Sequence, residues 1–134
     1  MSQENVDRLR EAVEAINRRD IDGALNLSHP DIEWQTLDSF PDAGTYHGPE
    51  GVRSFFQTWL DTFKGFRLHL EKCVPAGDQQ VLATLRVSGV GAESGVSVES
   101  PEFVQLLEFR DDLLIRSRMF QTENEALEAA GLRE

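Results

Sequence analysis

The order of sequence patterns predicts an α+β fold, in which helices gather on one face of a sheet. Two segments with helical spacing of apolar residues come first, and a third helical pattern with an aromatic face follows a short candidate strand. From residue 66 to residue 121 the chain shows strand patterns divided by turn residues. Helices therefore precede a run of strands that antiparallel pairing can connect.

The N-terminal segment has the spacing of an amphipathic helix, with charged residues on its other side. Its apolar positions are Val6, Leu9, Val13 and Ile16. Asp20 can cap a second, shorter helix that carries Ile21, Ala24 and Leu25, because aspartate accepts hydrogen bonds from the N–H groups of a first turn. We expect this helix to stop at His29-Pro30, since the residue before a proline avoids helical geometry.

Residues 31–37 alternate in polarity around Trp34 and predict a short strand. The next element is a helix that Gly48-Pro49-Glu50 opens, with proline near its first position and an acid in its first turn. One face of this helix is strongly apolar and must cover something. That face consists of Val52, Phe55, Phe56, Trp59, Leu60 and Phe63.

The rest of the chain predicts strands at residues 66–74, 80–90, 96–109 and 114–121. Arg110 to Leu113 has the length of a two-residue hairpin turn, which requires Asp112 to adopt the left-handed conformation. Thr122 and Glu125 have capping-box spacing and open a short final helix.

Composition limits the function classes. A chain of 134 residues fits one domain, spanning residues 1–134, with one core. Its formal charge of -11 repels nucleic acid and anionic membrane surfaces, so we expect neither as a partner. Cys73 is the single cysteine, and no stretch approaches the roughly 18 to 20 apolar residues that span a bilayer. We therefore expect a soluble, cytoplasmic protein.

Five segments carry a resemblance to a known family: residues 29–34, residues 44–53 with the aromatic helix, residues 95–99, residues 109–111 and residues 125–132. Together they resemble the nuclear transport factor 2-like superfamily and, within it, the SnoaL-like polyketide cyclase group. The resemblance implies a cone-shaped, strongly curved, mostly antiparallel sheet with helices packed on its concave face. It also implies an apolar cavity at the wide end of the cone and a homodimer formed through the outer sheet face.

The superfamily includes ketosteroid isomerases, epoxide hydrolases, cyclases and noncatalytic members, so the fold does not settle the function. The resemblance places the isomerase general base at Trp34, its oxyanion tyrosine at Ala12 and its protonated aspartic acid near Gln105. None of these residues can perform the corresponding step, because tryptophan accepts no proton from carbon and alanine donates no hydrogen bond. Steroid isomerisation by that route is therefore not expected.

Gln105 is a candidate for orienting a ligand carbonyl or hydroxyl. If Arg110 pairs with Leu113 in a regular ladder, Gln105 shares a face with Arg118 and Phe120, which we take as ligand-binding candidates. The same composition also fits a core edge whose polar tips reach solvent or a partner. Val104, Leu106, Ile115 and Met119 then fall on the opposite face, where they suggest a dimer contact.

Asp38 is the candidate general base, because Trp34, Phe40 and Tyr46 could supply the apolar setting that raises a carboxyl pKa. Tyr46 could donate a hydrogen bond to a carbonyl, although loop packing explains this residue equally well. Asp42 and Glu99 are weaker carboxylate candidates that fit solvated surface positions.

The sequence predicts no metal or nucleotide cofactor. The spacing of His29, His47 and His69 matches no metal motif, and no glycine-rich phosphate loop or dinucleotide fingerprint is present. Each histidine also has an ordinary structural explanation, as a cap, a loop residue or an outward strand residue.

We therefore expect a cavity that holds a small, mainly apolar organic molecule. Its predicted lining is Trp34, Phe40, Tyr46, Phe55, Trp59, Gln105 and Phe120, with Arg118 nearby. If the protein is an enzyme, the reaction is cofactor-free cyclisation, isomerisation or hydration of a carbonyl or epoxide compound, with Asp38 as base and Tyr46 or Gln105 orienting the carbonyl. The alternative is a noncatalytic ligand-binding or dimerisation module.

Overall fold

The computed structural model describes residues 2–40 and 43–131. Within these ranges the chain has the predicted α+β fold. The helices are α1 (Ser2–Asn17), α2 (Ile21–Leu25), α3 (Gly48–Thr62) and α4 (Glu123–Ala129). The strands are β1 (Ser28–Gln35), β2 (Thr45–His47), β3 (Phe63–Pro75), β4 (Gln80–Gly91), β5 (Ser97–Glu99), β6 (Phe103–Arg110) and β7 (Leu113–Phe120).

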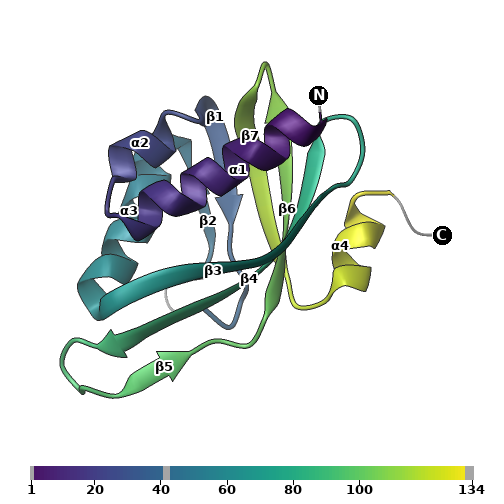
Figure 1. The fold of residues 1–134 in the computed structure, drawn as a ribbon. Coiled ribbons are helices and arrows are strands. Elements are labelled where there is room, and N and C mark those ends of the chain that lie inside the picture. Colours follow the sequence, from purple (N-terminus) through teal and green to yellow (C-terminus); the bar gives the residue numbers. More distant parts are fainter. Residues whose placement is uncertain (1, 41–42, 132–134) are drawn as a thin grey trace.

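The strands form one curved sheet with the order β2-β1-β7-β6-β4-β3, and β5 pairs with β4 (Figure 1). Pairing is antiparallel except between β1 and β7, which run parallel. The expected strongly curved, mostly antiparallel sheet is therefore confirmed, and the parallel pair makes it mixed.

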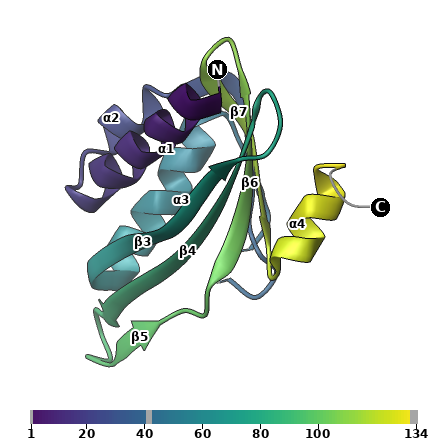
Figure 2. The ribbon, with the colours of Figure 1, turned by 45° about the vertical axis from the view of Figure 1, so that its right-hand side comes forward.

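Helices α1, α2 and α3 lie over the concave face, whereas α4 lies alone on the convex face (Figure 2). The main core fills the concave side, because the apolar stripes of α1 and α3 pack there against alternate strand residues. On the convex side Ala126 of α4 packs with Leu106 of β6, and both are fully buried. The closing helix thus departs from the expected one-sided arrangement.

The N-terminal helices form largely as the sequence predicts. The carboxylate of Asp20 accepts a hydrogen bond from the Gly23 backbone N–H at 2.9 Å and caps α2. However, α2 already ends at Leu25, and β1 begins at Ser28 rather than Asp31. His29-Pro30 lies inside β1, where the register with β7 shifts between Ser28 and Glu33. An irregular stretch tolerates proline, which has no N–H to donate.

Two further boundaries differ from expectation. Helix α3 ends at Thr62, so Phe63 opens β3, although its ring still lies 5.5 Å from that of Trp59. The strand expected over residues 96–109 is divided into β5 and β6. Pro101 lies in the break, and both pieces pair with different parts of β4. A proline cannot donate to a central ladder, which favours the break at this position.

The hairpin between β6 and β7 closes as predicted, with Arg110 opposite Leu113 and with Asp111 and Asp112 at φ angles of 53° and 67°. Beyond Phe109 and Leu114 the ladder contains a bulge, because Glu108 lies opposite Arg116 and leaves Ile115 as the extra residue. Such a bulge exchanges the faces of all later residues of β7 relative to a regular ladder.

Candidate functional site

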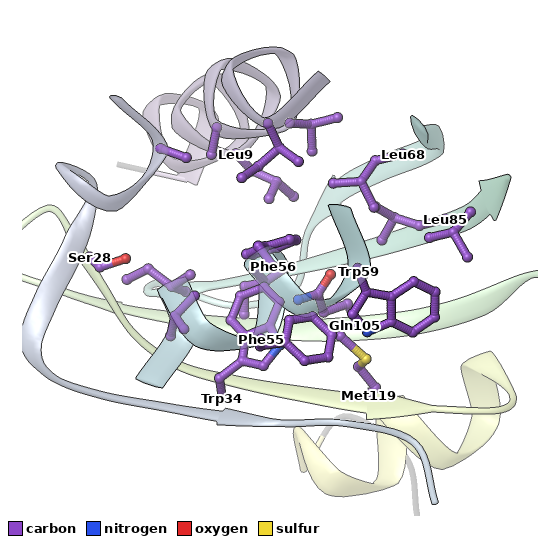
Figure 3. Close-up of a pocket in the computed structure, with 18 of the residues that line it drawn as sticks. Leu9, Ser28, Trp34, Phe55, Phe56, Trp59, Leu68, Leu85, Gln105 and Met119 are labelled. Carbon is purple, nitrogen blue, oxygen red and sulfur yellow. The ribbon is translucent and has the colours of Figure 1, made fainter. Parts of the chain in front are cut away.

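A cavity of about 70 Å³ lies between the concave face of the sheet and helices α1, α2 and α3 (Figure 3). Apolar side chains from all of these elements line it. The side chains between the sheet and these helices therefore do not fill the space completely.

Helix α3 contributes the aromatic part of the wall. Val52, Phe55, Phe56 and Trp59 all line the cavity and are buried, as their helical spacing predicts. The Phe55 ring lies 5.2 Å from that of Phe56 and 6.0 Å from that of Trp59, in tilted or edge-to-face arrangements. Aromatic pairs favour these arrangements, so the wall is well packed on this side.

Trp34 enters the wall from β1, where its side chain is 8% exposed. Its ring packs against Phe55 and Phe56 at 5.8 and 5.4 Å. Its indole Nε1 is buried and has no hydrogen-bond partner among the residues that the structure describes. A buried N–H group without a partner is uncommon and needs an explanation.

Phe40 covers the cavity from the loop between β1 and β2. Its ring meets Phe103 edge to face at 5.2 Å and lies 5.3 Å from Trp59. Reciprocal hydrogen bonds close the loop, since Thr36 N donates to Gly44 O and Gly44 N donates to Thr36 Oγ1, both at 3.0 Å. A partly buried aromatic residue of the loop thus forms part of the cavity wall.

Gln105 is the most polar residue of the wall and is only 4% exposed. Its Nε2 donates a hydrogen bond of 2.5 Å to Oγ of Ser117, which is fully buried. Within the described part of the chain its Oε1 accepts no hydrogen bond. The expected location of Gln105 in the cavity wall agrees with this geometry.

Arg118 and Phe120 lie on the other face of the sheet, contrary to the sequence prediction. Because of the bulge, Gln105 lies opposite Met119, and Met119 rather than Arg118 lines the cavity. Arg118 points to the convex side, where its Nη2 donates to Oε1 of Glu108 at 2.9 Å and its guanidinium lies 5.9 Å from the Phe120 ring.

The alternation within β7 could have revealed this error. Arg116 and Arg118 alternate with the uncharged Ser117 and Met119, and a charged residue rarely faces an apolar core. The sequence prediction assumed a regular ladder between the two strands and therefore assigned Arg118 to the cavity face. The same bulge turns Met119 from the proposed dimer face to the cavity. Val104 and Leu106 lie on the face opposite Gln105 as expected, but they are buried in the cluster beneath α4.

The three predicted catalytic residues are not brought together. Asp38 is exposed in the loop and does not line the cavity, so it lacks the apolar surroundings that its proposed role requires. Tyr46 pairs with Trp34 across β1 and β2, and its ring meets that of Phe55 at 5.4 Å, outside the cavity wall. Only Gln105 lines the cavity.

The weaker carboxylate candidates also lie elsewhere. Glu99 is exposed on β5 and pairs with Nη1 of Arg86 at 3.0 Å. Asp42 lies outside the described residues. Over residues 2–40 and 43–131 no group of three His, Cys, Asp or Glu side chains could hold a metal ion. No helix in these ranges is long and apolar enough to cross a membrane.

Sequence reasoning missed most of the apolar wall, including the contributions of α1 and the inward residues of β3 and β4. It placed Trp34, Phe40, Phe55, Trp59 and Gln105 in the wall correctly, whereas Tyr46 and Phe120 lie outside it. Ala12, Trp34 and Gln105, which the family resemblance places at catalytic positions, all line this one cavity. The described residues of the wall include none with an ionisable side chain. The three positions that the resemblance aligns with the isomerase groups therefore lie in one cavity.

The model of the SnoaL-like domain family matches residues 9–117. The chain belongs to the SnoaL-like domain family. No curated protein matched this SnoaL-like chain.

Three solved structures illustrate the fold. A nuclear transport factor 2-like protein from Burkholderia thailandensis is 24% identical, with a TM-score of 0.78 over 95% of this chain and 96% of that one. TerC, co-crystallised with polyporic acid, is 21% identical, with a TM-score of 0.75 over 96% and 98%. AclR, a putative hydroxylase from Streptomyces galilaeus, is 18% identical, with a TM-score of 0.75 over all of both chains. At these identities the likeness concerns the fold alone.

Proposed function

We propose that this SnoaL-like chain binds a small, mainly apolar organic molecule in the concave cavity without transforming it. The observation that carries this proposal is the absence of ionisable side chains from the described cavity wall. Proton-transfer catalysis needs an acid or base within about 3 Å of the reacting group, or one water molecule away. Binding requires only apolar surface and a few polar groups, which this wall provides.

The cavity volume limits the ligand size. Each water molecule needs roughly 10 to 15 Å³ of such space, so a cavity of about 70 Å³ accommodates about five to seven non-hydrogen atoms. A single six-membered ring with one substituent fits this range. A larger ligand requires wall residues to move outward, such as Phe40, which lies in a loop and is only partly buried.

A catalytic function is the second candidate, and the loop between β1 and β2 favours it. Asp38 is two residues from Phe40, so a loop movement that admits a ligand also moves this carboxylate. In that case Asp38 acts as the base, while Tyr46 or Gln105 orients the carbonyl of a substrate undergoing cyclisation, isomerisation or hydration. Convergence of the three family positions on the cavity supports retention of the substrate site.

Tryptophan fluorescence tests the binding proposal directly, because both tryptophans of the chain line the cavity. We expect saturable fluorescence changes with single-ring compounds such as methylcyclohexane and cyclohexanone, and unchanged NMR spectra of these compounds after long incubation. An Ala12→Phe variant, which fills the cavity, should lose the response. Product formation that disappears in an Asp38→Asn variant would instead establish the enzymatic function.

Two further expectations remain proposals. We propose that the protein is cytoplasmic. We also propose that it forms a homodimer through the convex face of the sheet, which the family resemblance supports. Because α4 and the underlying strands bury the apolar residues Val104 and Leu106, such a dimer would use the more polar surface beside α4. Sedimentation equilibrium over a range of concentrations tests it, and a constant monomer mass would contradict it.

A further inference from the structure

We propose that the natural ligand carries a hydroxyl group on a single ring, which accepts a hydrogen bond from Trp34 Nε1 and donates one to Gln105 Oε1. This inference rests on the proposed binding function and names the class of ligand. It assigns Trp34 a polar role at the position where the family resemblance places a carboxylate base.

The first observation is the indole N–H of Trp34. The residue is 8% exposed and lines the cavity, and its Nε1 has no partner among the described residues. The N–H of tryptophan can only donate, so its partner must be an acceptor. Since a buried donor without a partner carries the full cost of its desolvation, a ligand oxygen at this position gains binding free energy.

The second observation is the orientation of the Gln105 amide. Its Nε2 donates to Ser117 Oγ, while Oε1 accepts no hydrogen bond within the described chain. The residue is 4% exposed, and the fully buried Ser117 holds its amide nitrogen, so the protein fixes the orientation of the amide. In this orientation Gln105 offers the cavity an acceptor.

The sheet register and the hydrogen bond of Gln105 place both side chains beside Ser117. Trp34 lies opposite Ser117 in the parallel pair of β1 and β7, and Gln105 reaches Ser117 from β6. All three side chains lie on the concave face, with Ser117 between the other two. Figure 3 shows the side chains of Trp34 and Gln105 in the same part of the wall, beside Phe55.

A donor and an acceptor on the two sides of Ser117 match the chemistry of a hydroxyl group, which both accepts and donates. A ketone or ether oxygen can satisfy only the indole N–H, and a hydrocarbon satisfies neither group. A carboxylate or ammonium ligand would enter without a counter-ion, because the described wall has no ionisable side chain. The residues that line the cavity therefore favour a neutral, monocyclic alcohol or phenol as the ligand.

The test uses cyclohexanol, cyclohexanone and methylcyclohexane, which have the same number of non-hydrogen atoms and similar shapes. We expect the wild-type protein to bind cyclohexanol about 2- to 10-fold more tightly than cyclohexanone, which corresponds to one additional net hydrogen bond. Trp34→Phe should weaken binding of both oxygen compounds by a similar factor and leave methylcyclohexane unchanged. Gln105→Met should weaken cyclohexanol binding and remove its preference over cyclohexanone.

Trp59→Phe is the matched control, since it removes the other indole of the same wall and leaves Trp34 as the fluorescent reporter. We expect it to leave the ratio of cyclohexanol to cyclohexanone affinity unchanged. In the wild-type protein, cyclohexanol should also shift the Trp34 indole N–H resonance downfield in a ¹H–¹⁵N spectrum. The absence of that resonance from Trp34→Phe assigns it.

The outcomes separate the two proposals. If none of the three compounds binds, the proposed function fails. If methylcyclohexane binds but Trp34→Phe leaves cyclohexanol affinity unchanged, and the indole resonance does not shift, cavity binding stands and the hydroxyl assignment is overturned. A ketone that binds as tightly as the alcohol also overturns it.

Discussion

The two faces of the sheet carry different chemistry, although alternate residues of the same strands build both. The concave face meets three helices and lines a cavity whose described wall has no ionisable side chain. The convex face carries ion pairs, with Glu108 bound to Arg118 at 2.9 Å and Glu71 bound to Arg86 at 2.7 Å. Only α4 covers part of this face, over a small apolar cluster.

This difference shows where polar groups can be tolerated. The convex charges keep partial access to solvent, 17% for Arg118 and 25% for Glu108, and each has an opposite charge beside it. On the concave face a charge would be buried without a partner. One bulged residue, Ile115, decides which side chains of β7 belong to which environment. Local register, rather than residue type alone, therefore sets the chemistry of the cavity.

The largest expected effect comes from a charge on the concave face. Leu107 is fully buried in the cavity wall, so Leu107→Asp should lower the free energy of unfolding by more than about 4 kcal/mol. Arg118→Met, which removes a convex charge, should cost about 1 kcal/mol or less, since Glu108 keeps Arg116 at 3.8 Å. Urea unfolding measures both, and similar losses would contradict the contrast between the faces.

An intermediate effect is expected where α4 covers the convex face. Ala126 is fully buried, so Ala126→Leu should overpack this contact and cost about 1–3 kcal/mol. Hydrogen exchange should quicken in α4 while the amides of α3 stay protected, because the two helices pack on opposite faces. Ala129→Leu, at an exposed position of the same helix, should change little. Equal loss of protection in α3 would show that the faces are not independent.

The smallest effect concerns Cys73, which lies beside Ala83 at the edge of the concave core. Burial raises the pKa of its thiol. The folded state therefore binds the thiol proton more tightly than the unfolded chain, where the pKa is about 8.5. The corresponding stability is fully present below about pH 8.5 and is lost as pH rises through the folded-state pKa.

Cys73→Ala isolates this contribution. The free energy of unfolding of the wild type should fall more than that of the variant between pH 7 and pH 10, in urea titrations with a reductant present. Parallel curves for the two proteins would show that the apolar environment does not reach this strand edge.

Periodicity predicted the elements well where one face of an element is buried. The helical stripe from Val52 to Trp59 faces the cavity as expected, because 3.6-residue spacing fixes which side chains share a helix face. Thr122 and Glu125 form the complete capping box that their spacing predicts. These signals are local, so the sequence contains them in full.

The sequence predictions failed where pairing between segments that are distant in the sequence decides the structure. The division into β5 and β6 depends on which part of β4 each strand meets. The outward direction of Arg118 depends on the bulge at Ile115. Asp38 was chosen for its aromatic sequence neighbours, yet a loop can place such neighbours in the core and leave the carboxylate in solvent.

The sequence by itself determined the α+β class, the amphipathic faces and the family, since these depend on local spacing and on motifs along the chain. Only the tertiary structure decided that Trp34, Gln105 and Ser117 meet on one concave face, and that Arg118 does not. The reason is that a strand presents alternate residues to opposite faces, so a single inserted residue reverses every later assignment without changing the local pattern.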